Sequence, residues 1–105
     1  MMGLKLKPFI NRNGYYIENA YYELERIEYN ITIHSISFFG NIYLSKEHKD
    51  QGYYPIDAFE DGFEIDSLPE EPVKYIYNYI KDRANNNKED LAYKGFIDCE
   101  LIEEA

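Results

Sequence analysis

The spacing of apolar residues changes once along this chain, and that change restricts the fold more than any other feature. Most of the chain alternates apolar and polar side chains, as strands do. One segment instead places apolar residues at the i, i+3, i+4 and i+7 positions of a single helix face, namely Val73, Ile76, Tyr77 and Ile80. The pattern predicts one principal helix near residues 69–84 in a chain that is otherwise mostly β.

Start and stop signals flank this helix. Ser67 followed three residues later by Glu70 resembles a capping box, and either Pro69 or Pro72 suits a first helical turn. The polar run NNNKED, residues 85–90, interrupts the apolar stripe and is expected to end the helix.

The N-terminal part of the chain has the pattern of a hairpin. Asn13-Gly14 is a strong turn signal, so we expect strands near 3–10 and 14–19 on its two sides. Pro8 cannot donate a backbone hydrogen bond, which suggests that the first strand lies at a sheet edge.

Strand patterns continue beyond the hairpin. Residues 21–29 alternate with one change of phase, which a bulge near Glu25-Arg26 would explain, and a short helix is the alternative. The run ITIHSISFF, residues 31–39, is rich in β-branched and aromatic residues. Ile31 and Ile33 would face one side of that strand, and Ile36 and Phe38 the other. Apolar residues on both faces predict a central strand.

Glycine positions suggest where the remaining strands turn. We expect a turn at Gly40-Asn41 before a strand that begins at Ile42, and another turn at Asp61-Gly62. A last strand is expected in AYKGFIDCELI, residues 92–102. The order of elements predicts an α+β fold, mainly an antiparallel β sheet or a small sandwich with one principal helix packed on it. At 105 residues, we expect a single domain over 1–105.

The charge balance excludes some partners. The formal net charge is −9, from 20 acidic and 11 basic residues, and binding to nucleic acid or to an anionic membrane needs the opposite sign. Lys5, Lys7 and Pro8 interrupt the only apolar run that could resemble a secretion signal. We therefore expect a soluble protein that is not exported. Cys99 is the single cysteine, so no internal disulfide can form, and we expect a small, partly buried strand residue.

Known catalytic and metal-binding motifs are absent from the sequence. It contains no dinucleotide fingerprint, no phosphate-binding loop, no HExxH and no cysteine pair with metal spacing. A calcium-loop pattern from Asp57 fails because Phe59 and Leu68 occupy ligand positions. His34 is expected to be a hydrogen-bonded strand residue and His48 a solvated loop residue. We predict no catalytic residue, no cofactor and no metal, and so a protein that is not an enzyme.

A block without basic residues lies between Lys49 and Lys74. It contains eight acids, Asp50, Asp57, Glu60, Asp61, Glu64, Asp66, Glu70 and Glu71. Two interpretations stay open: a solvated face with helix-capping acids, or an acidic docking surface for a basic partner or a mimic of DNA phosphates.

Tyrosine is the second unusual feature of the composition, with 12 residues, six of them in adjacent pairs. The pairs are Tyr15-Tyr16, Tyr21-Tyr22 and Tyr53-Tyr54. Neighbouring side chains of a strand point to opposite faces, so each pair should place one ring in the core and one outside. Because tyrosine is enriched at interfaces, we predict that these six residues form a partner-binding surface. Ordinary cross-strand pairing of the rings is the alternative.

Two segments resemble small proteins encoded in the tail modules of siphophages that infect low-GC Gram-positive bacteria. They are IYLSKEHKD, residues 42–50, and EEPVKYIYNYIKDRANNNKEDLAYKGFIDCE, residues 70–100. The resemblance implies a small β-rich fold similar to the shoulder-type domain of phage receptor-binding proteins. It also implies an accessory role in the tail or in host interaction, with other phage tail proteins or further copies of the chain as partners. The expected location is then the virion or the host cytoplasm. An acidic, DNA-mimicking inhibitor of a host nucleic-acid-binding protein is the alternative function.

We predict that the fold needs no calcium or zinc, because the acidic block lacks ligand spacing and Cys99 has no second cysteine. Adding EDTA should leave the melting temperature unchanged in a thermal melt followed by circular dichroism. A sharp drop on chelation, reversed by one added metal, would contradict this.

Overall fold

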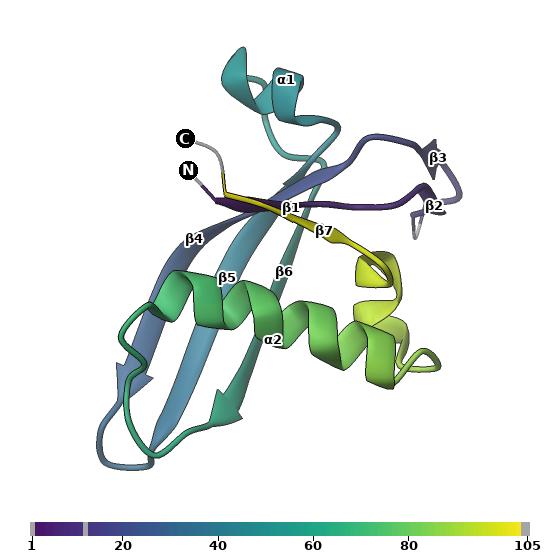
Figure 1. Ribbon diagram of the computed structural model, residues 1–105. Coiled ribbons are helices and arrows are strands. Elements are labelled where there is room, and N and C mark those ends of the chain that lie inside the picture. Colours follow the sequence, from purple (N-terminus) through teal and green to yellow (C-terminus); the bar gives the residue numbers. More distant parts are fainter. Residues whose placement is uncertain (1, 12, 104–105) are drawn as a thin grey trace.

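The computed structural model of the protein describes residues 2–11 and 13–103. Within these residues the chain forms a five-stranded sheet, a separate two-stranded hairpin and one long helix (Figure 1). The predicted α+β class with an antiparallel sheet and one principal helix is confirmed. The elements in chain order are β1 (Gly3–Lys5), β2 (Phe9–Ile10), β3 (Tyr16–Ile17), β4 (Tyr21–Asn30), β5 (Ser35–Tyr43), α1 (Lys46–Asp50), β6 (Asp57–Glu64), α2 (Pro72–Asn86), the 3-10 helix η1 (Leu91–Phe96) and β7 (Glu100–Ile102).

The sheet has the strand order β6-β5-β4-β1-β7, and every neighbouring pair is antiparallel. Helix α2 lies across one face of the long strands β4, β5 and β6, while α1 lies at one end of the sheet (Figure 1). Strands β1 and β7, from opposite ends of the chain, pair side by side through Leu4 and Leu101. Strand β6 is therefore one free edge of the sheet and β7 the other.

Helix α2 supplies one side of the core. Ile76, Tyr77, Ile80 and Ala84 are buried and pack against the sheet. Val73, the first residue of the predicted stripe, is instead 38% exposed. The helix begins only at Pro72, so Val73 lies in its first turn, at the margin of the packed interface.

Some of the predicted start and stop signals of α2 are confirmed and others are not. Pro72 is the first helical residue, as one of the two prolines was expected to be. The N-cap is Glu71, whose side chain makes no capping hydrogen bond, so the predicted Ser67 and Glu70 capping box does not form. The helix ends at Asn86, inside the NNNKED run, as expected.

The predicted N-terminal hairpin exists, but it is short and separate from the main sheet. β2 and β3 pair Phe9 with Ile17, and Ile10 with Tyr16. The single strand expected over 3–10 is wrong, because the chain divides into β1 and β2 around Pro8. Pro8 thus lies in the break between two strands, and its missing N–H removes the donor that a continuous strand would need.

Strand β4 contains the predicted bulge. Its pairing with β5 shifts register between Leu24 and Arg26, so the strand interpretation is confirmed over the helical alternative. The shift keeps Tyr22 and Leu24 on the same face as Ile27, and all three pack in or against the core under α2.

Residues 31–34 are not part of a strand. They form the turn between β4 and β5, and Ile31 is 76% exposed. The Asn30 side chain causes this turn, because its Oδ1 accepts hydrogen bonds from the backbone N–H groups of Thr32 and Ile33. β5 itself begins at Ser35 and lies between β4 and β6, so the expected central position is confirmed.

The turns predicted at Gly40-Asn41 and Asp61-Gly62 are wrong, because both glycines lie inside strands. Gly40 lies inside β5 and Gly62 inside β6. A Cβ atom at Gly40 would lie 2.5 Å from the Tyr22 ring, so this glycine makes room for an aromatic side chain. The strand expected to begin at Ile42 is the end of β5, and the chain then enters α1.

The C-terminal strand expected over 92–102 is also only partly right. Its first half is the 3-10 helix η1, and only Glu100–Ile102 pairs as β7. Cys99 is buried, as expected, but lies just before the strand.

Replacing Ile76 with Ala should lower the free energy of unfolding by about 2–5 kcal/mol, because this fully buried side chain packs between α2 and the sheet. Val73→Ala is the matched control, and it should cost much less because Val73 is partly exposed. Denaturant melts of both variants measure the difference. Equal losses would contradict the packing of α2 described above.

Candidate functional site

The three tyrosine pairs do not divide between core and surface. Tyr21 and Tyr22 are both buried, whereas the members of the other two pairs, Tyr15, Tyr16, Tyr53 and Tyr54, are all exposed. The prediction of one inward and one outward ring is therefore wrong for every pair. Because Tyr21 and Tyr22 are inside the fold, they cannot belong to a partner-binding surface of the folded protein.

Tyr21 and Tyr22 do point to opposite faces of β4, but both faces are covered at this position. Tyr22 lies on the α2 side, with edge contacts to Phe59 and Phe96 at 6.1 and 5.1 Å between ring centroids. Tyr21 lies on the other side, where its ring passes over Gly3. The two side chains alternate between the faces of β4 as predicted. The alternation alone does not show that both faces of the strand are covered at this position.

A buried polar cluster surrounds Tyr21. Its hydroxyl donates to Oε2 of Glu23 at 3.2 Å, and Nζ of Lys49 in α1 contacts Oε1 of the same carboxylate at 3.2 Å. Glu23 is the one buried charged residue among those described. Burial, and then the neighbouring Glu23 carboxylate, raise the pKa of Tyr21 well above its ordinary value. This cluster fixes α1 to the sheet and leaves no free reactive group.

The hydroxyl of Tyr77 connects α2 to β4 and to the residue just before β1. It accepts a hydrogen bond from the backbone N–H of Leu24 at 2.8 Å and donates to the carbonyl of Met2 at 3.0 Å. Burial raises the pKa of Tyr77 to about 12. Tyr22 likewise donates to the carbonyl of Phe59, and burial raises its pKa well above the ordinary range. These phenols have structural partners and remain protonated at neutral pH.

Tyr93 forms a third buried contact, between η1 and the edge strand. Its hydroxyl donates to a carboxylate oxygen of Asp61 on β6. Burial, and next this hydrogen bond, raise the pKa of Tyr93 well above its ordinary value. The guanidinium of Arg83 lies 5.0 Å from the centre of the Tyr93 ring and contacts Asp90 at 3.2 Å. One acid of the acidic block is therefore committed to the fold.

The histidines also have structural partners. His48 Nδ1 lies 2.8 Å from the hydroxyl oxygen of Ser45, the N-cap of α1, which also accepts from the His48 backbone N–H. This serine and histidine contact belongs to a helix cap. His34, expected in a strand, lies in the β4–β5 turn with Nδ1 3.2 Å from the carbonyl of Asp66. His48 lies in α1 and not in a loop.

The acidic block is divided between several surfaces. Along β6, Asp57 and Asp61 point to the α2 side, whereas Glu60 and Glu64 point to the opposite, outer face of the sheet. Asp50 lies in α1, and the remaining acids lie in the loop before α2. The eight carboxylates thus do not line up along a single face.

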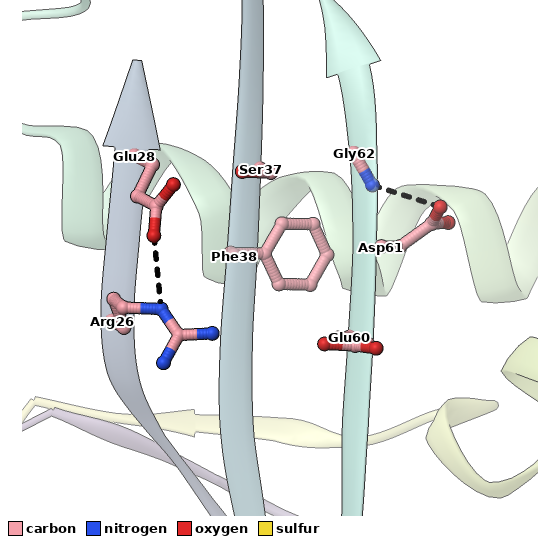
Figure 2. Close-up of a pocket in the computed structure, with 7 residues that line it drawn as sticks. All are labelled: Arg26, Glu28, Ser37, Phe38, Glu60, Asp61 and Gly62. Atoms are coloured by element: carbon pink, nitrogen blue, oxygen red, sulfur yellow. Dashed lines mark hydrogen bonds and ion pairs between the residues drawn. The ribbon is translucent and has the colours of Figure 1, made fainter.

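The outer face of the sheet has a shallow polar hollow of about 330 Å³ (Figure 2). Arg26 and Glu28 enter it from β4, Ser37 from β5 and Glu60 from β6. The Arg26 guanidinium is already paired with Glu28 at 3.2 Å and lies 5.3 Å from the centre of the Phe39 ring. Its one cation is therefore occupied, and the hollow presents mainly carboxylate and hydroxyl groups.

Another group of exposed apolar side chains lies on the β2–β3 hairpin. Ile10 on β2 is 68% exposed, and its cross-strand neighbour Tyr16 is exposed on the same face of the hairpin. Phe9 and Ile17, the other cross-strand pair, turn inward and pack in or against the core. The β2–β3 hairpin thus has one face anchored in the protein and one apolar face towards solvent.

Beside the hairpin lies a depression, which we call the hairpin groove. Its volume is about 780 Å³. Residues 6–11 form one wall, η1 forms the other, and Ile42 and the first residues of β6 contribute between them. Leu91, at the start of η1, lines the groove and is 81% exposed. Sequence reasoning missed Ile10 and Leu91, because a single apolar residue within or just before a predicted strand carries no sign that it faces solvent.

Tyr53 and Tyr54 lie in the loop between α1 and β6. The Tyr53 ring contacts the imidazole of His48, with 5.3 Å between centroids, while Tyr54 is almost fully exposed. Of the six predicted partner-binding tyrosines, only Tyr15 and Tyr16 share the hairpin.

Comparison with known proteins adds no assignment. No family model matches the chain, and no curated protein or solved structure matches it. Within residues 2–11 and 13–103, no three histidine, cysteine or acidic side chains are grouped so that they could hold a metal ion. None of the helices in that part of the chain has the length and apolar character needed to cross a membrane.

We predict an alkaline unfolding transition. A buried phenol with a raised pKa favours the folded state while it is neutral, so its contribution is fully present below pH 10, the ordinary tyrosine pKa, and is lost as the pH rises towards 12 and beyond. Circular dichroism and phenolate absorbance should therefore change together above pH 10. The variant Tyr54→Phe should leave the transition in place. Smooth ionisation of the tyrosines with unchanged circular dichroism would contradict the prediction.

Proposed function

We propose that this protein is a non-enzymatic accessory or structural protein of a bacteriophage, in a tail or host-interaction module, and that it works through protein–protein contacts. The observation that carries the proposal is the solvent-facing side of the β2–β3 hairpin. There Ile10 and Tyr16 pair across the strands, Tyr15 lies beside them, and all three are exposed.

The hairpin is suited to a contact because it is held in place before any partner binds. Phe9 and Ile17 anchor its inner face, and the Asn11 side chain closes its loop by accepting hydrogen bonds from the N–H groups of Asn13 and Tyr15. A rigid aromatic surface loses little conformational entropy on binding. Tyrosine combines a large apolar ring with a hydroxyl that tolerates water, as interface residues require.

The phage assignment rests on the resemblance of residues 42–50 and 70–100 to siphophage tail-module proteins. In this chain these segments form α1 with the end of β5, and α2 with η1. Of these segments, Ile42 and the η1 region line the hairpin groove, which lies beside the contact surface.

The arrangement of charge favours this function over a DNA mimic. A mimic needs carboxylates spaced along one face as phosphates are, whereas Asp61 bonds Tyr93 and the other β6 acids divide between two faces. The inhibitor of a host nucleic-acid-binding protein therefore remains the alternative, with less support.

The variant Tyr16→Ser tests the contact. A central interface tyrosine is worth roughly 2 kcal/mol or more, so partner affinity should fall by about 30-fold. The tagged full-length chain is used to capture proteins from lysates of host cells and of phage-infected cells, and the captured protein is identified and its affinity measured with purified components. Circular dichroism should be unchanged, because Tyr16 is exposed.

Ile31→Ser is the matched control, because Ile31 is equally exposed but lies in the β4–β5 turn. It should leave partner affinity unchanged. Specific capture of a host nucleic-acid-binding protein, insensitive to Tyr16→Ser, would overturn the proposal in favour of the inhibitor.

A further inference from the structure

The hairpin groove combines a hollow and projecting side chains on one surface. Its lining is mostly apolar and includes Leu6, Phe9, Ile42, Phe59, Phe96 and Ile97. Ile10 and Leu91 also line it, yet both remain largely exposed at 68% and 81%. A surface that carries both a hollow and protruding apolar groups can be complementary to itself across a two-fold axis.

The charges around the groove identify the partner that it fits. Four charged residues line it, two lysines and two aspartates: Lys7, Lys94, Asp57 and Asp98. Their formal charges cancel, although the whole chain carries −9. Two copies of the chain repel each other wherever acidic surfaces meet, whereas at this groove, whose lining charges cancel, they would not.

A basic partner would be attracted to other parts of the molecule. The outer face of the sheet presents Glu28, Glu60 and Glu64, and its cation Arg26 is already paired. The balanced groove offers a cationic protein no such attraction. Local neutrality combined with apolar side chains instead matches a second copy, which brings the same two lysines and two aspartates.

Association by strand addition is hindered at the free edges of the sheet. On β6, the N–H groups of Ala58 and Gly62 donate to the carboxylates of Asp57 and Asp61, each at 2.8 Å. Figure 2 shows the second of these bonds. These N–H groups are therefore not available to another strand. The other edge, β7, is only three residues long. Contact through side chains, which closes at two copies, is then the available route.

We propose that the protein forms a symmetric homodimer through the hairpin groove, with Leu91 and Ile10 of each copy packed in the groove of the other. This inference rests on the proposed role in protein contacts and names a second copy of the chain as the partner. The exposed face of the hairpin, including Tyr16, extends the same contact.

The experiment is sedimentation equilibrium of the full chain over a wide concentration range. The wild-type protein should be a dimer that dissociates on dilution. Leu91→Glu should weaken the dimer by at least about 30-fold, because it places a charge in an apolar contact of hot-spot value. The double variant Lys7→Glu with Lys94→Glu should weaken it as well, because the groove then becomes acidic in both copies.

Ile31→Glu is the control, because it adds the same charge at an equally exposed residue of the β4–β5 turn and should leave the dimer intact. Circular dichroism should match for all variants, since every substituted side chain is exposed. A wild-type monomer at every concentration, or a dimer unchanged by Leu91→Glu, would overturn the proposal. A monomer that still captures another protein in a Tyr16-dependent way would overturn the dimer and leave the proposed function standing. If neither association is found, both fail.

Discussion

The hydroxyl of Tyr77 joins the helix to the sheet by two hydrogen bonds, in addition to the apolar packing of Ile76 and Ile80. It bridges the N–H of Leu24 on β4 and the carbonyl of Met2 just before β1, at 2.8 and 3.0 Å. The pairing between β1 and β4 includes Leu4 with Tyr22, and the hydroxyl supplies partners just beyond that point. Without it, a half-buried donor and acceptor would lose their hydrogen bonds, at about 1–3 kcal/mol for each group left unsatisfied. This contact therefore helps to position α2 over the core, together with the apolar residues of the helix.

Tyr77 belongs to a cluster of aromatic side chains inside the fold. Tyr22 contacts Tyr77, Phe59 and Phe96 edge to face, and Tyr93 approaches Phe59 from η1. A phenol can fill apolar space and still use its hydroxyl on a backbone group or a carboxylate. Gly40 and Gly3 make room for two of the rings. Four of the twelve tyrosines, Tyr21, Tyr22, Tyr77 and Tyr93, are therefore core residues, and the other eight are partly or fully exposed.

Several of the acidic residues also have structural partners inside the fold. Glu23 pairs with Lys49 and Tyr21, Asp61 accepts from Tyr93, and Asp57 and Asp61 occupy backbone N–H groups of the edge strand. A net charge of −9 thus includes carboxylates with structural tasks. The β2–β3 hairpin presents an apolar side beside a groove whose lining charges cancel, and this is the surface for which we propose a protein contact.

The sequence by itself determined the features that depend on near neighbours in the chain. The helix stripe of Ile76, Tyr77 and Ile80, the bulge in β4 and the hairpin around Gly14 follow from spacing and local conformational preference, and all three appear in the structure. Tertiary structure decided the rest. Whether Gly40 turns the chain or clears space depends on the ring of Tyr22, which belongs to another strand. Whether both members of a tyrosine pair are buried depends on a second layer of cover, which for Tyr21 comes from β1 and the neighbourhood of α1. Alternation states which way a side chain points, but only packing between distant segments determines what it meets there.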